Sequence, residues 1–187
     1  MLKKVIIAGI LGTIVMFVWT FVINGFFRFQ ASIDMKQIDK EQQVYEVLKQ
    51  HIVEPGRYVF NPEITQEMVF PEGEPAFSVL YGGVGHEVAG DLMLLRLIVG
   101  FLAVLIGAWM LSQTSAQILA SYWRRVLFFT SIGLLIALFS DLSKFGIGGY
   151  PVKDALLLAL NNIITWTIVG LVVAWRIKPS KTNATNA

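Results

Sequence analysis

The sequence contains no cysteine and few charged residues. None of its 187 residues is Cys, and 15% are Asp, Glu, Lys or Arg, against about a quarter in an ordinary soluble domain. The absence of Cys excludes disulfide scaffolds, Cys-ligated zinc, iron–sulfur clusters and thiol nucleophiles. The formal net charge of +2 also argues against a nucleic-acid partner, because binding to nucleic acid depends on a strongly basic surface.

Long apolar runs take the place of the missing charges. Hydrophobic residues make up 55% of the chain, and a membrane-spanning helix needs about 20 mostly apolar residues in succession. The sequence therefore predicts an α-helical membrane protein with a four-transmembrane-helix bundle. The expected spans cover about residues 5–27, 88–111, 125–142 and 154–175. The first run exceeds the apolar core of a typical signal peptide, so we expect it to be retained.

Charge distribution predicts the orientation of these spans. The short segments 1–4, 112–125 and 176–187 contain seven basic residues and no acidic residue, whereas segment 28–87 contains five basic and ten acidic residues. Basic residues favour the cytoplasmic side of a membrane. We therefore expect a multi-pass protein of the inner (plasma) membrane with both termini cytoplasmic. Residues 1–27 would form the first span, 28–87 an extracytoplasmic cap, and 88–187 the other three spans and a cytoplasmic tail.

The extracytoplasmic segment predicts a small α+β cap. Val44, Val47, Leu48 and Ile52 recur at helical spacing, which indicates a helix over about residues 40–51. Residues 57–60 and 76–81 are expected to be short strands, because turn residues bound both runs. A cap of this size has little core of its own. We therefore expect its apolar face to rest on the ends of the spans or on a partner.

Several polar residues fall in the expected outer parts of the spans. Ionisable groups inside a membrane are costly and mark candidate sites. Arg96 and Asp141 each share a stripe with small residues, which let helices approach closely. We therefore expect the two to form an ion pair, with Asn161 or Asn162 completing the hydrogen bonds. This pair has three readings: a structural link between helices, a site for a small solute or lipid, or an Arg96 that extends to the headgroups. The predicted cluster comprises Arg96, Asp141, Asn161, Asn162, Trp19 and Asn24.

Recognisable catalytic spacings are missing from the chain. The group formed by His86, Glu87 and Asp91 is the best candidate for a metal or acid–base site, but it lacks an HExxH-type spacing. We therefore expect no cofactor, no metal and no catalytic residue. The alternative is an enzyme that acts at the membrane surface through these three residues.

Three short stretches resemble a known group of proteins. They are Met16-Phe17-Val18-Trp19, the run from Glu54 to Phe60, and the stretch from Ser140-Asp141 to Tyr150-Pro151. Together they resemble bacterial four-span inner-membrane proteins with a long first extracytoplasmic loop. The resemblance implies an architecture but no activity.

The expected function is that of a non-enzymatic accessory or scaffold subunit. Such a subunit would bind a larger membrane complex, or further copies of itself, through the cap and the helices. The alternative is binding or transport of a small solute or lipid at the polar cluster.

Overall fold

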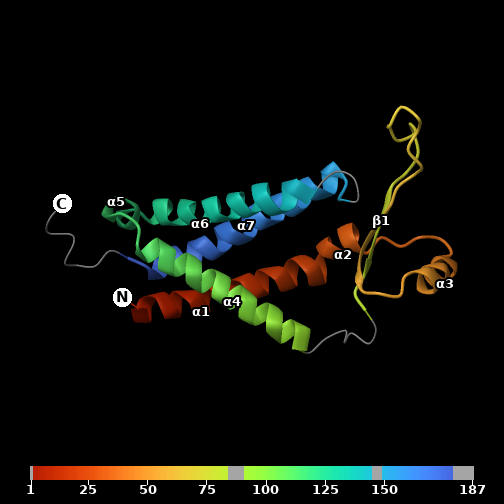
Figure 1. Ribbon diagram of the computed structural model, residues 1–187. Coiled ribbons are helices and arrows are strands. Elements are labelled where there is room, and N and C mark those ends of the chain that lie inside the picture. The colour runs from red at the N-terminus through yellow and green to blue at the C-terminus, as the bar shows by residue number, and fades with distance from the viewer. Residues whose placement is uncertain (1, 84–90, 145–148, 179–187) are drawn as a thin grey trace.

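Four long apolar helices dominate the structure. The computed structural model describes residues 2–83, 91–144 and 149–178. Within these ranges four helices are long and apolar enough to cross a membrane, which confirms the number of expected spans: Leu2–Phe26, Met93–Ser112, Tyr122–Lys144 and Val152–Arg176. Figure 1 shows the start of α1 and the end of α7 at the same end of the bundle, and the small cap at the other end, here called the cap end.

The helices differ in detail from their expected ranges. The third span begins at Tyr122, three residues earlier than expected, and the short helices α2 and α5 were not predicted. The first and third spans each end in a π-helical turn, η1 and η2, and the third continues as a 3₁₀ turn, η3. In chain order the bundle elements are α1 (Leu2–Phe21), η1 (Val22–Phe26), α4 (Asp91–Ser112), α5 (Ala116–Ala120), α6 (Tyr122–Ile136), η2 (Ala137–Asp141), η3 (Leu142–Lys144) and α7 (Val152–Arg176).

Helix α7 is the centre of the bundle. It packs along α6 on one side and along α1 on another, and α1 in turn packs on α4. The largest fully buried side chains lie in the half of the bundle away from the cap: Val104, Leu111, Phe129, Val169 and Val173. In contrast, every described side chain from Met93 to Val99 is exposed. The cap-end half of α4 therefore lies apart from the other helices, as Figure 1 shows.

Small residues allow close contacts between helices. Gly107 and Gly133 belong to the predicted stripes of small residues, whereas Gly170 was not predicted. A Cβ atom placed on Gly133 of α6 would lie 3.0 Å from the Cα atom of Ile163, and one on Gly170 of α7 would lie 2.6 Å from the Cβ atom of Phe129. Gly107 of α4 faces the same Phe129 ring. These glycines bring the helix backbones together in the buried half of the bundle.

The cap contains two helices and one two-stranded sheet. Helices α2 (Phe29–Asp34) and α3 (Glu41–His51) precede strands β1 (Gly56–Phe60) and β2 (Phe77–Tyr81). The strands pair antiparallel, with Gly56 opposite Tyr81 and Phe60 opposite Phe77. The predicted helix and both strands are confirmed to within one residue. Residues 56–81, here called the arm, run across the cap end of the bundle, and the tip of the arm projects beyond the bundle (Figure 1).

Candidate functional site

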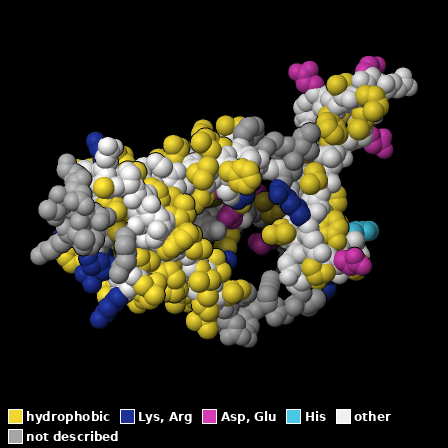
Figure 2. Space-filling view, turned by 60° about the vertical axis from the view of Figure 1, so that its left-hand side comes forward, with side chains coloured by type: hydrophobic (Ala, Val, Ile, Leu, Met, Phe, Trp, Pro, Cys, Tyr) yellow, Lys and Arg dark blue, Asp and Glu magenta, His cyan; other side chains and the backbone are white. Residues whose placement is uncertain are grey.

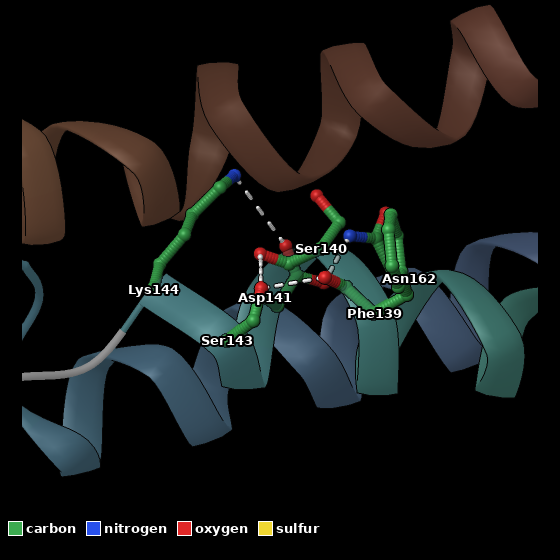
Figure 3. Close-up of polar contacts among 6 residues, drawn as sticks. All are labelled: Phe139, Ser140, Asp141, Ser143, Lys144 and Asn162. Carbon is green, nitrogen blue, oxygen red and sulfur yellow. Dashed lines mark hydrogen bonds and ion pairs between the residues drawn. The ribbon is translucent and has the colours of Figure 1, made fainter.

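Asp141 lies at the centre of a polar cluster at the cap end of the bundle. It ends the π-helical turn η2 and is 4% exposed. The side-chain amide of Asn162 donates a hydrogen bond to Asp141 Oδ2 at 2.5 Å, and the Lys144 ammonium lies 4.0 Å from Asp141 Oδ1 (Figure 3). A buried carboxylate is costly unless it is paired and hydrogen bonded. Asn162 and Lys144 meet both requirements, from α7 and from the next turn of the same span.

Trp19 joins α1 to α7 near this cluster. Its indole N–H donates to Thr165 Oγ1 at 3.1 Å, and the Thr165 hydroxyl donates to the backbone carbonyl of Asn161 at 2.7 Å. Asn161 thus takes part through its backbone. Asn24 lies in the π-helical turn η1, where its side-chain oxygen accepts a 3.2 Å hydrogen bond from the backbone N–H of Gln30. Asn24 therefore positions the start of α2.

The expected ion pair between Arg96 and Asp141 is not formed among the described residues, where the acid has Asn162 and Lys144 as partners. The reason is the course of α4, which packs mainly on α1 and stays apart from α7. Arg96 is exposed and lies only three residues from Met93, the start of the described span. The reading in which Arg96 extends to the lipid headgroups stays a prediction.

A second set of charged residues connects the cap to the start of α7. Lys36, which follows α2, forms a 2.7 Å ion pair with Asp154 in the first turn of α7. An acid in this position also interacts favourably with the helix N-terminus. Figure 2 shows a hollow between bundle and cap, with acidic and basic side chains at its edge.

Tyr150 belongs to the same connection. The carboxylate of Asp34 raises the pKa of the Tyr150 hydroxyl above its usual value, because it opposes the formation of a phenolate. Burial acts in the same direction, whereas the positive charge of Arg57 lowers the pKa of Tyr150. Asp34 of α2 and Arg57 of the arm thus both act on the pKa of a residue in the loop that leads into α7.

The candidate metal site falls largely outside the described structure. His86 and Glu87 lie outside the described residues, and so does the side chain of Asp91, the first residue of α4. Within the described part of the chain, no three His, Asp or Glu side chains are grouped so that they could hold a metal ion.

Comparison with known proteins finds no matching family model, no matching curated protein and no matching solved structure. The resemblance to bacterial four-span proteins therefore stays a prediction.

The arrangement favours a structural role for the polar cluster. Two hydrogen-bonded pairs link the helices: Asn162 with Asp141, which joins α7 to η2, and Trp19 with Thr165, which joins α1 to α7. Sequence reasoning missed Lys144 as the partner of Asp141, although the spacing of three residues was a signal for it. It also missed Thr165, Lys36 and Tyr150, because their contacts join segments far apart in the chain.

Proposed function

We propose that the protein is a non-enzymatic, membrane-anchored docking subunit, with both termini cytoplasmic and the cap on the extracytoplasmic side. The asymmetric charge of the short and long segments supports this orientation. The four helices provide the anchor, and their exposed apolar surfaces suit contact with lipid or with the helices of a partner. The arm is the surface that docks an extracytoplasmic partner.

The observation that carries this proposal is the exposed apolar surface of the arm. Large apolar side chains that remain in water mark interaction sites when they gather in one place. Eight such residues lie along a segment of 26 residues outside the four spans, at 40% to 80% exposure. They are Val59, Phe60, Ile64, Met68, Val69, Phe70, Phe77 and Leu80. A two-stranded ribbon gains little core of its own, so a partner would cover these side chains.

The charge of the arm indicates the chemistry of that partner. Its tip carries Glu63, Glu67, Glu72 and Glu74, and no Lys or Arg occurs between Tyr58 and Leu95. The backbone N–H of Glu67 lowers the pKa of that carboxyl, which favours its charged form. Opposite charges across an interface steer association and select partners. The arm therefore suits a protein surface with apolar pockets and basic residues at its rim.

Affinity capture from native membranes tests the proposal. Full-length tagged protein is compared with a Met68→Ser/Phe70→Ser variant, which removes apolar contacts at the tip. The matched control is Val44→Ser on α3, because Val44 is also apolar and exposed but lies outside the arm. We expect a stoichiometric partner with the wild type and the control, and its loss with the arm variant.

Two outcomes would contradict this function. One is recovery of the same partner, in the same amount, with the arm variant. The other is a wild-type protein that elutes from native membranes as a monomer without any stoichiometric partner.

A further inference from the structure

A groove separate from the polar cluster lies in the cap, between α3 and the base of the arm. Its volume is about 610 Å³, within the range of about 300–1,000 Å³ typical of small-molecule sites. Aliphatic side chains from three segments line it: Leu48, Ile52, Val53, Val79 and Leu80. Ile52 is buried at its base, whereas Val53 and Leu80 are 77% and 78% exposed. The groove is therefore an open apolar channel in a segment that the sequence places outside the membrane.

One charged residue stands in this apolar lining. Among the described lining residues, Lys49 alone carries a charge, and its ammonium lies 5.9 Å from the centre of the Tyr45 ring. That distance permits a cation–π interaction, which holds the ammonium beside the groove. Glu46, one turn earlier on α3, accepts a hydrogen bond from Gln42 and is not part of the lining. Lys49 therefore remains available for an anionic ligand group.

We propose that this groove binds a single-chain amphiphile with a carboxylate head. The aliphatic residues would cover the chain, because burial of apolar surface stabilises such a complex. The Lys49 ammonium would receive the carboxylate through a charge-assisted hydrogen bond, and Tyr45 and Tyr81 are also among the lining residues. This inference does not depend on the docking function. Leu80 belongs to both surfaces, but the tip of the arm, where the docking variant is changed, takes no part in the groove.

Photolabelling of the full-length protein tests the site. The protein is held in a detergent with a neutral headgroup and labelled with a diazirine analogue of hexadecanoic acid. Labelled peptides are then identified by mass spectrometry. We expect adducts in α3 and β2, displaced by hexadecanoate and about threefold less well by hexadecanol, since exposed ion pairs contribute modestly.

Variants separate the charge from the apolar lining. Lys49→Met should reduce labelling about threefold and abolish the preference for the carboxylate over the alcohol. Lys40→Met, a change of another exposed lysine of the cap, should leave both unchanged. Val79→Thr keeps the side-chain shape and the strand preference but adds a hydroxyl to the lining, so it should weaken labelling about threefold or more. Thermal unfolding of each variant shows that the fold is kept.

The proposal is overturned by adducts confined to the four long helices, which would show general partitioning into the apolar surface. It is also overturned by equal labelling of Lys49→Met and wild type, or by equal competition from the acid and the alcohol.

Discussion

At the scale of single residues, Gly133 sets the distance between α6 and α7. A Cβ atom there would lie 2.9 Å from Trp166 Cβ and 3.1 Å from the backbone oxygen of Asn162. Backbone atoms cannot move aside as the end of a side chain can. We therefore predict that Gly133→Ala destabilises the protein by about 1–3 kcal/mol, as overpacking does, in thermal unfolding in detergent.

The matched control for this change is Gly100→Ala on α4. A Cβ atom at Gly100 meets only the sulfur of Met16 at 3.8 Å, which is an ordinary contact. Equal stability of the two variants would show that α6 and α7 do not approach as closely as described.

The hydrogen bond between Asn162 and Asp141 gives a second prediction. Asn162→Ala leaves the buried Asp141 carboxylate with Lys144, at 4.0 Å, as its one partner among the described side chains. Loss of a partner from a buried acceptor costs about 1–3 kcal/mol, so the variant should unfold at a lower temperature. Asn161→Ala is the neighbouring control, because its side chain makes no hydrogen bond with a described residue. An unchanged unfolding temperature for Asn162→Ala would remove Asp141 from the links between helices.

Tyr150 provides a pH-dependent prediction. Its raised pKa means that the fold favours the protonated phenol. This contribution to stability is present in full below the unfolded pKa of about 10, and it is lost as the pH rises through the folded value. The tyrosinate absorbance of wild type minus that of Tyr150→Phe should show a midpoint above about 10.

Asp34→Asn should lower the midpoint of Tyr150, because the carboxylate beside the phenol is removed. Asp39→Asn, another acid of the cap, should leave the midpoint in place. If Asp34→Asn leaves the Tyr150 midpoint unchanged, as Asp39→Asn should, the Asp34 carboxylate does not act on the Tyr150 phenol.

The sequence indicated the hydrogen-bond partner of Asp141 better than it indicated the position of Arg96. Asn161 or Asn162 was expected to hydrogen bond with Asp141, because the antiparallel spans place their polar residues at similar depth. Asn162 makes this contact. Arg96 was misplaced, because its partner depends on how far α4 diverges from α7. No local pattern in α4 encodes that divergence.

At the scale of elements, the arm is an exposed segment of the cap with little regular structure between its strands. Between its strands, the described backbone hydrogen bonds are local: Thr65 with Val69, Met68 with Thr65, and Glu74 with Pro71. Exposed segments with few such bonds are preferred sites of proteolysis. We predict that a Glu-specific protease first cuts the full-length protein between residues 61 and 76, as read from the masses of the fragments.

Trypsin is the internal control for this cleavage, because residues 58–95 contain no Lys or Arg. It should leave that stretch uncut under the same conditions. If the arm of the purified full-length protein resists the Glu-specific protease, another part of the protein, or a second copy, covers it.

Elements with strong local signals were predicted well. Helix α3 has apolar residues at helical spacing, and turn residues bound both strands. Helices α2 and α5 were missed because each is only five or six residues long, too short for a periodic pattern. The π-helical turns have no simple sequence signal. Both lie at the cap end of the bundle, and π-helical turns in proteins are frequent at functional sites.

At the scale of the whole molecule, burial and charge point to the same arrangement. Apolar side chains cover the outside of the four helices, and the buried core lies in the half away from the cap. The described part of the acidic segment, residues 28–83, forms the cap. The start of α1, the start of α6 and the end of α7, where the described basic residues of the short segments lie, are at the opposite end. The docking function rests on this asymmetry, because the arm must face the extracytoplasmic side.

The absence of native cysteine makes this orientation directly measurable. A single Cys is introduced at Glu72 in the arm or at Ser115 between α4 and α5, both of which are exposed positions. Spheroplasts that express each variant are treated with a membrane-impermeant maleimide, before and after permeabilisation. We expect Glu72→Cys to be labelled in intact spheroplasts and Ser115→Cys only after permeabilisation. The reverse pattern, or equal labelling of both variants in intact spheroplasts, would contradict the proposed orientation.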